Sequence, residues 1–287
     1  MYFVISRGFL SKKVRQTALI FAVCIKKNKT LMFFAVCGIF FLKENGSMRM
    51  RKKPNLIPRM ERCAQVQIKD PKALKGMWRE SFADYKKLWL ELGCGKGRFT
   101  AGTAQANPDS MLIAVEKVPD AMVTAMERVC DAGIENIRFI DMDALELGEV
   151  FDNAEVGRIF INFCDPWPKS RDAKHRLTAP GFLRSYADLL PMGGEIHFKT
   201  DNRPLFDWSV EQLTAEGWEL RELTNDLHAN GVSGIMTDYE AKFHAQGVNI
   251  NRLVAVKTES TKTTASGEVP RLRDAALSDA RGKAEDK

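Results

Sequence analysis

The chain has 287 residues, of which 45% are hydrophobic and 28% charged, and its formal net charge is +6 at pH 7. These proportions are those of a globular protein with a sizeable core, and the basic balance suits a polyanionic partner without requiring one. The six cysteines are scattered, with no C-x-x-C pair and no histidine at ligand spacing, which argues against a disulfide framework and a metal site.

The first 47 residues hold two short apolar runs, 17–25 and 31–42, separated by a basic stretch. Neither run reaches the roughly 20 residues that a membrane helix needs, and no small-residue cleavage site follows them. Because Met48 begins a segment of different character, we expect residues 1–47 to be an upstream extension from a mis-assigned start, outside the fold. A membrane-associating extension is the alternative.

Residues 48–86 are predicted to form a basic N-terminal arm, flexible and able to approach a polyanion. Its cations are Arg49, Arg51, Lys52, Lys53, Arg59 and Arg62. At the other end of the chain, residues 258–287 have almost no large apolar side chains. Such a segment buries too little surface to offset its ordering entropy, so we expect a disordered polar tail.

Between residues 87 and 257, short apolar runs alternate with amphipathic stretches, a rhythm typical of βαβ units. The expected strands are 88–92, 111–116, 137–140, 158–163, 194–200, 218–223 and 251–257. The expected helices are 99–105, 119–132, 179–190 and 205–216. The sequence therefore predicts an α/β fold with a Rossmann-like, doubly wound, seven-stranded sheet, mostly parallel with an antiparallel final strand.

A glycine-rich turn follows the first expected strand, with Glu91 at its mouth and then Gly93, Gly95 and Gly97. Glycines let the backbone turn tightly and approach a ligand closely. The spacing is G-x-G-x-G, whereas dinucleotide-binding turns use G-x-G-x-x-G, and Glu91 would repel a pyrophosphate. A cofactor that carries an ammonium and a sulfonium group tolerates this acid.

Two further acids follow the next two strands. Glu116 ends the second strand, where a carboxylate can accept both hydrogen bonds of a ribose diol. Asp143 follows the third strand, where a polar group can reach an adenine amine while Ala144 leaves room for the ring. Acids at three successive strand ends predict an S-adenosylmethionine site. A nicotinamide-dependent oxidoreductase is the alternative from a different enzyme class.

The fourth expected strand runs into the turn Asp165-Pro166-Trp167-Pro168, in which two prolines restrict the backbone. An acid beside the transferable methyl group and an aromatic ring nearby favour a planar nitrogenous substrate, and a rigid loop with a buried tryptophan is the alternative. The cation-rich run 169–176 follows at once and predicts phosphate docking, unless it is only a solvated face. A non-catalytic RNA-binding module would explain these cations but not the three acids.

Taken together, the segments ELGCGKGRF, AVEK, DMDA, FCDPWPKSRDAKHR, HFKTDN and TDYEAKF resemble the bacterial tRNA (guanine-N7)-methyltransferases. The resemblance covers roughly Met48 to Lys257. It implies S-adenosyl-L-methionine as cofactor, tRNA as partner, and the variable-loop guanine at tRNA position 46 as target. Another RNA or base substrate is the alternative. We also expect a cytoplasmic monomer without a membrane partner, because no long apolar surface helix or heptad seam stands out.

The roles expected at individual positions follow from the motifs and from this resemblance. Cofactor binding is expected at Glu91, Gly93, Gly95, Gly97, Glu116, Asp143, Ala144 and Asp165, and Asp165 is also the implied catalytic residue. Substrate binding is implied for Lys169, Asp201, Thr237, Asp238, Tyr239 and Glu240. RNA contacts are implied for Arg171, Asp172, Ala173, Lys174, His175 and Arg176.

These residue types fit the chemistry that the resemblance implies. Guanine N7 has a free lone pair and no proton, so its attack on a methyl group needs no general base. The reaction needs in-line positioning and stabilisation of the positive charge that appears on the purine. The carboxylates of Asp165, Asp201 and Glu240 would meet this need by accepting hydrogen bonds from guanine N1–H or N2–H₂.

Overall fold

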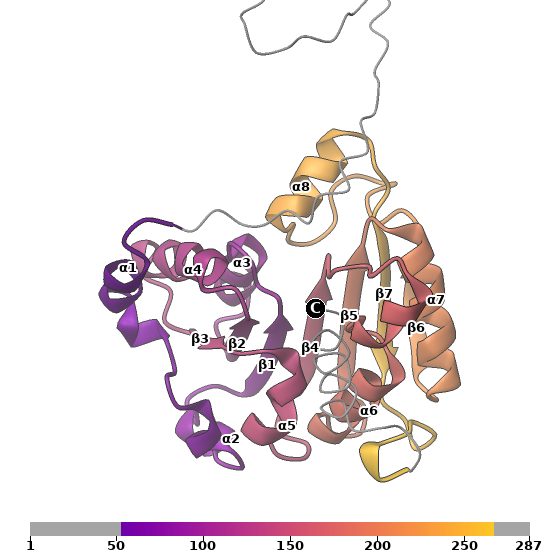
Figure 1. Ribbon diagram of the computed structural model, residues 1–287, viewed down its shortest axis with the longest axis horizontal. Coiled ribbons are helices and arrows are strands. Elements are labelled where there is room, and N and C mark those ends of the chain that lie inside the picture. Colours follow the sequence, from indigo (N-terminus) through magenta and orange to yellow (C-terminus); the bar gives the residue numbers. More distant parts are fainter. Residues whose placement is uncertain (1–52, 267–287) are drawn as a thin grey trace, which may run out of the picture. The chain divides into compact units, whose positions relative to one another are not determined.

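The computed structural model describes residues 53–266, which are built around a seven-stranded sheet in the order β3-β2-β1-β4-β5-β7-β6 (Figure 1). The strands are β1 Lys87–Leu92, β2 Ser110–Glu116, β3 Ile137–Asp141, β4 Arg158–Asn162, β5 Glu195–Thr200, β6 Glu219–Thr224 and β7 Asn251–Val256. β1 to β5 pair in parallel, and β7 runs antiparallel to both of its neighbours. The predicted fold class is confirmed, including the antiparallel final strand.

Helices cover both faces of the sheet. One face carries α3 (Arg98–Ala106) and α4 (Pro119–Asp131), and the other carries α5 (Leu147–Val150), α6 (Pro180–Leu189) and α7 (Arg203–Ala215). The alternation of side chains along a strand decides which face each residue meets. In β1, the leucines at 88, 90 and 92 pack toward α6 and α7, whereas Trp89 and Glu91 point to the α3 side.

The four helices predicted from sequence are all present within two residues of their expected bounds. α4 and α6 begin with a proline in the first turn, where its missing N–H costs nothing. Four more helices were not predicted: α1 (Leu56–Arg62), α2 (Trp78–Ser81), α5 and α8 (Asp238–Ala245). Short 3₁₀ turns occupy Ala64–Val66, Pro71–Leu74, Ala144–Glu146, Ser170–His175 and Thr264–Ser266.

The described part of the basic arm is folded onto the domain. α1 lies beside α4 (Figure 1), where Arg59 Nε donates to Glu127 Oε1 at 2.8 Å and Arg62 reaches the same carboxylate at 3.0 Å. Trp78 is fully buried, and its indole N–H donates to the carbonyl of Val150 at 2.8 Å. The first three cations of the arm and the expected extension 1–47 lie outside the described residues.

The chain also stays packed beyond β7. Thr261 is 8% exposed, and its hydroxyl donates to the carbonyl of Gly217 at 3.0 Å. A Cβ at Gly217 would lie 2.1 Å from the carbonyl oxygen of Ser260, so the close approach of these two backbone segments requires a glycine. The remainder of the expected tail, 267–287, lies outside the described residues. Among the helices of residues 53–266, none is long and apolar enough to cross a membrane.

Candidate active site

The glycine turn after β1 adopts backbone conformations that favour glycine. Gly93, Gly95 and Gly97 have φ values of 75°, 56° and 75°. A Cβ at Gly97 would lie 2.5 Å from the Cβ of Ala125, so this glycine allows α3 to pack closely against α4. A Cβ at Gly93 or Gly95 would meet nothing within 4 Å. The space over the first two glycines is therefore open to a ligand.

Glu116 joins the end of β2 to this turn. Its Oε2 accepts from the backbone N–H of Gly95 at 2.9 Å, and its Oε1 accepts from that of Val118 at 3.0 Å. The residue is 8% exposed, and burial raises the pKa of its carboxyl. Each carboxylate oxygen has a second lone pair that can accept from a ligand hydroxyl.

Glu91 is buried on the α3 side of the sheet, with 1% of its surface exposed. The Thr100 hydroxyl donates to its Oε2 at 2.6 Å, and Asn162 Nδ2, at the end of β4, lies 3.5 Å from its Oε1. Burial raises the pKa of the Glu91 carboxyl to about 7. The other amide atom, Asn162 Oδ1, is buried without a hydrogen-bond partner among the described residues. Buried acceptors of this kind are suited to a cationic or N–H donor ligand.

Asn162 was not singled out from the sequence. It is the one polar residue after the apolar run Ile159–Ile161, and a polar group that ends a buried parallel strand points to a ligand site. That signal was available, although the neighbouring D-P-W-P turn is more conspicuous.

Asp143 follows β3 and is more exposed than Glu91 and Glu116, with 42% of its side chain accessible. It accepts from the backbone N–H of Leu145 at 3.0 Å and lies 3.9 Å from Lys117 Nζ. Ala144 packs partly against the core beneath. The structure thus places Glu91, Glu116 and Asp143 at the carboxyl ends of three adjacent parallel strands.

The Asp165 turn at the end of β4 has an unusual backbone. Phe163 and Trp167, on either side of it, have φ values of 54° and 41°, in the left-handed region that non-glycine residues rarely adopt. Such conformations cost about 1–3 kcal/mol each and persist only where surrounding contacts hold them. Asp165 is exposed between them. The turn therefore presents this carboxylate on a constrained backbone.

Arg176 provides one of those contacts. Its Nε donates to the carbonyl of Pro166 at 3.0 Å, and a terminal nitrogen donates to that of Trp167 at 2.9 Å. The guanidinium lies 4.4 Å from the centre of the Trp208 ring, a cation–π contact. This residue, expected to contact RNA, is directed at its own active-site turn.

The rest of the cationic run differs from Arg176. Lys169 is exposed, and the Arg171 side chain is 77% exposed, with its Nε 3.8 Å from Asp172 Oδ1. The His175 ring packs against Trp167 with centroids 5.1 Å apart. Within the predicted RNA-contacting set, Arg171 thus offers its charge to solvent.

α8 carries the predicted substrate motif 237–240 and lies beyond the ends of β4 and β5 (Figure 1). It is attached to the Asp165 turn because Phe243 stacks on Phe163, with ring centroids 6.2 Å apart. Tyr239, 57% exposed, extends this stack. Asp201, just after β5, is half-buried, and burial raises the pKa of its carboxyl.

Within the motif, Thr237 and Glu240 form a capping box at the start of α8. The Thr237 hydroxyl accepts from the Glu240 N–H at 2.9 Å, and Glu240 Oε2 accepts from the Thr237 N–H at 3.2 Å. Glu240 is completely buried, whereas Asp238 lies at the surface, 3.6 Å from Arg128. The structure therefore directs the Glu240 side chain into the protein, where groups of the chain itself donate to it.

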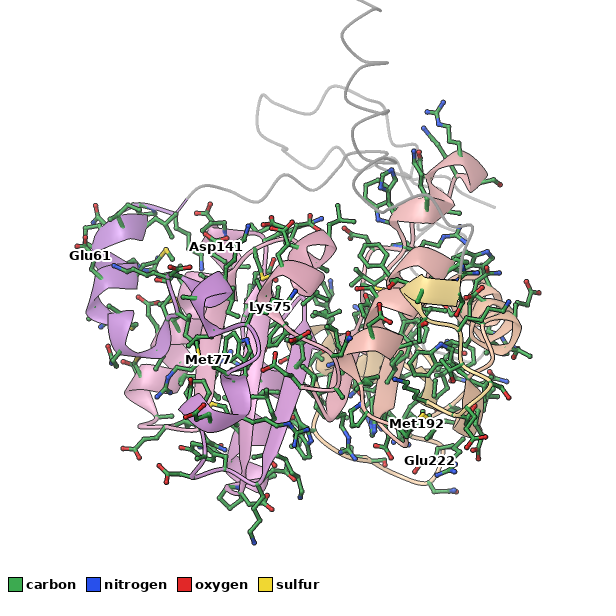
Figure 2. All side chains as sticks on the ribbon, turned by 90° about the horizontal axis from the view of Figure 1, so that it is seen from below. Glu61, Lys75, Met77, Asp141, Met192 and Glu222 are labelled. Carbon is green, nitrogen blue, oxygen red and sulfur yellow. The ribbon has the colours of Figure 1, made fainter. Side chains whose placement is uncertain are left out.

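A cavity of about 320 Å³ lies on the same face of the sheet as Glu91 and is lined by Asn162, the neighbour of Glu91. Lys199 also lines it from the sheet, and Ser233, Gly234 and Ile235 line it from the loop before α8. At the edge of the sheet it is bordered by Glu222, which is labelled in Figure 2 and pairs with Arg252. No three His, Cys, Asp or Glu side chains gather as a metal ion would require anywhere in residues 53–266.

Comparisons with known proteins agree with this architecture. A family profile described as "Putative methyltransferase" matches residues 85–253. A 16S rRNA methyltransferase, KamB, shares the fold with a TM-score of 0.50 at 17% identity, covering 64% of this chain and 94% of that one.

Curated relatives match over almost their whole length. A "tRNA (guanine-N(7)-)-methyltransferase" from Listeria monocytogenes is 43% identical over 72% of this chain and 98% of its own. Proteins with the same name from Bacillus velezensis and Exiguobacterium sibiricum are 43% and 39% identical, over 95% and 100% of their lengths. With the profile match, this identity shows that the chain belongs to the bacterial tRNA (guanine-N7)-methyltransferase family.

Proposed function

We propose that this protein transfers a methyl group from S-adenosylmethionine to N7 of a guanine in tRNA, at position 46 of the variable loop. One observation carries the proposal: an open glycine turn with buried acceptors at the ends of β1 and β2 lies next to a constrained carboxylate at the end of β4. The relatives that share about 40% of this sequence bear the corresponding name, and membership of their family excludes the nicotinamide-dependent alternative.

The residues around the turn fit the proposed cofactor. Gly93 and Gly95 leave room for close approach, and Glu91 with Asn162 Oδ1 offers acceptors to an ammonium group. Glu116 is placed to accept from a ribose diol, and Asp143 with Ala144 to border an adenine. When bound, S-adenosylmethionine supplies an electrophilic methyl group on a cationic sulfur.

The protein's own contribution to the reaction is positioning and charge. Asp165, on its constrained turn, is proposed to accept a hydrogen bond from the guanine and to stabilise the positive charge that develops on the ring. Asp201, Thr237, Asp238 and Tyr239 are proposed to hold the base and its nucleotide from the α8 side. Because Glu240 already accepts internal hydrogen bonds, its proposed role is to fix that motif.

RNA binding is assigned to the exposed cations that follow the turn. Lys169 and Arg171 are proposed to contact phosphates, with Lys174 and His175 completing the surface. We further propose that the enzyme acts in the cytoplasm, where its tRNA substrate is found, and as a monomer.

The test uses the purified full chain, labelled methyl donor and two transcripts of one tRNA that differ only in having guanine or adenine at position 46. Nucleoside mass analysis is expected to find 7-methylguanosine in the first transcript and no labelled product in the second. Labelling of a 16S rRNA fragment in place of tRNA would support the alternative RNA substrate. A chain that labels neither RNA would overturn the proposal.

A further inference from the structure

A buried ion pair connects the sheet to the substrate motif. Lys199, on β5, is 7% exposed, and its Nζ lies 2.6 Å from Glu240 Oε2, while Glu240 is completely buried. The same ammonium donates to the backbone carbonyl of Ile235 at 3.1 Å. One side chain of the sheet therefore holds both ends of the segment 235–240, whose first residue, Ile235, lines the cavity.

Glu240 has a second anchor in His228. The His228 Nε2 lies 3.1 Å from Glu240 Oε1, and its Nδ1 accepts from the Ser233 N–H at 3.2 Å. His228 also meets the His244 ring edge-on, with centroids 4.7 Å apart. The loop 226–236 and the helix α8 are thus tied to each other through one carboxylate.

Charge balance makes Lys199 the essential member of this set. A carboxylate with no exposed surface is costly unless a cation and hydrogen bonds compensate for its lost hydration. Removing one partner of such a pair leaves an uncompensated buried charge, which destabilises more than the pair itself stabilises. For the segment 226–245, opening that hydrates Glu240 relieves this cost, because His228 and Glu240 are the only buried residues of the segment.

Lys199 also lies within electrostatic reach of the cofactor acid. Its charge lowers the pKa of Glu91, opposing the effect of burial, and both residues lie on the α3 face of the sheet. Its ammonium lies 5.0 Å from the centre of the Phe99 ring, at the start of α3. Lys199 therefore stands between the acid that faces the proposed cofactor and the acid that fixes the substrate motif.

We infer that Lys199 is a positioning residue that, together with His228, holds in place the motif Thr237–Glu240 and the loop before it, whose residues 233–235 line the cavity. This inference rests on the proposed function for its kinetic consequence but not for its structural one. The sequence assigned no role to Lys199 or to His228. Lys199 and Glu240 are 41 positions apart, and only the fold brings them together.

The test compares three substitutions in the full-length protein. Lys199→Met removes the charge and keeps the aliphatic stem, Lys199→Arg keeps the charge, and Lys257→Met is the matched control. Lys257 is also a partly buried lysine, but it donates to the carbonyls of Ala187 and Leu190, away from the site.

Hydrogen exchange of peptides from 226–245 is the first readout, and kcat and KM for tRNA are the second. Lys199→Met is expected to raise exchange in this segment about tenfold or more and to lower kcat/KM by a similar factor. Lys199→Arg should restore most of both, and Lys257→Met should change neither. Because Lys199 and Glu240 form one ion pair, the two substitutions should not act independently. The double variant Lys199→Met with Glu240→Gln should therefore lower kcat/KM by less than the product of the two single effects.

Unchanged exchange in 226–245 of Lys199→Met, or an equal rise in Lys257→Met, overturns the inference. If Lys199→Met does not fold, His228→Leu carries the test, because it removes the second anchor and should raise exchange in the same segment. A wild-type protein that makes no 7-methylguanosine contradicts the proposed function alone, since the exchange result is read independently.

Discussion

The candidate site has two halves. The cofactor half is the glycine turn with Glu91, Glu116 and Asp143, and the substrate half is the Asp165 turn, the cationic run 169–176 and the motif 237–240. The two halves differ in which way their side chains point. Around the glycine turn, Thr100 to Glu91 spans nine positions and Gly95 to Glu116 spans 21, and one longer contact joins Asn162 to Glu91 across 71 positions. In the substrate half, Lys199 meets Glu240 across 41 positions. Local contacts are encoded by a short motif, whereas distant ones decide which way a motif residue faces.

Two residues of the substrate half have surroundings that their motifs do not reveal. Arg176 belongs to a cationic run and Glu240 to an acidic motif, and both point inward to hold backbone or buried charge. In the cofactor half, Glu116 accepts from the backbone of the glycine turn at Gly95, as the motif suggests. Substitutions in the two halves should therefore affect different quantities: the methylation rate, the stability of the fold, or the binding of tRNA and cofactor.

The largest effect is expected for Asp165→Ala in the substrate half. Losing the carboxylate that is proposed to stabilise the developing charge should lower the single-turnover methylation rate about 100-fold or more. The affinity for tRNA should change only about threefold, because the phosphate contacts remain. Rapid-quench methylation and filter binding measure the two quantities, and Asp84→Ala, at an exposed and distant position, is the control. Full turnover in the variant would remove Asp165 from the chemistry.

Arg176→Met tests whether an arginine of the cationic run is architectural. Two carbonyls of the turn would lose their hydrogen-bond donor, and the Trp208 ring would lose its cation–π partner. We therefore expect the free energy of unfolding to fall by about 2–3 kcal/mol. The constrained turn should relax, with kcat about tenfold lower and the salt dependence of tRNA binding unchanged. Arg203→Met, on an exposed arginine paired with Asp207, is the matched control. An unchanged kcat with a flatter salt dependence would instead make Arg176 the phosphate contact that the sequence implies.

In the cofactor half, Glu91 should give binding a pH dependence. Its pKa is raised to about 7 by burial, so the neutral form is favoured in the free fold, and its contribution to stability is lost as the pH rises through that value. A cationic ligand favours the ionised form, so cofactor affinity should rise about tenfold from about pH 6 to about pH 8. Calorimetry measures this trend. Glu91→Gln should flatten it, and Glu211→Gln, at an exposed position, should not; a flat wild-type profile would contradict the assignment.

The sequence predicted the parts of the molecule that depend on local pattern. All seven strands could be located because apolar runs ending in glycine or polar residues recur at regular spacing. α8 was missed although Thr237 and Glu240 spell a capping box, because the residues after them lack a clear apolar stripe. α1 lies in the segment predicted to be a flexible arm, because no local signal pairs Arg59 and Arg62 with Glu127 on α4.

The site shows the same division. The placement of Glu91, Glu116 and Asp143 at one edge of the sheet could be predicted because adjacent parallel strands end at the same edge. Asn162, Lys199 and His228 were not, because their partners become neighbours only when β4, β5 and the loop before α8 come together. Pairing of this kind is a property of the tertiary structure, and a single sequence carries no period or spacing that reports it.

The smallest effect is expected for Arg171→Ala, and it makes the contrast within the cationic run quantitative. The side chain is 77% exposed, so its loss should leave the fold and kcat unchanged. If Arg171 neutralises one phosphate, the slope of log affinity against log salt should decrease by about 0.7–0.9, with similar weakening for every tRNA tested. An unchanged slope would mean that Arg171 contacts no phosphate. If Arg171→Ala instead had a low kcat and a normal salt dependence, Arg171 would act as Arg176 is expected to act, on the turn and not on RNA. Two arginines five positions apart would then do the same work, and the direction of a side chain in the fold would not predict its role.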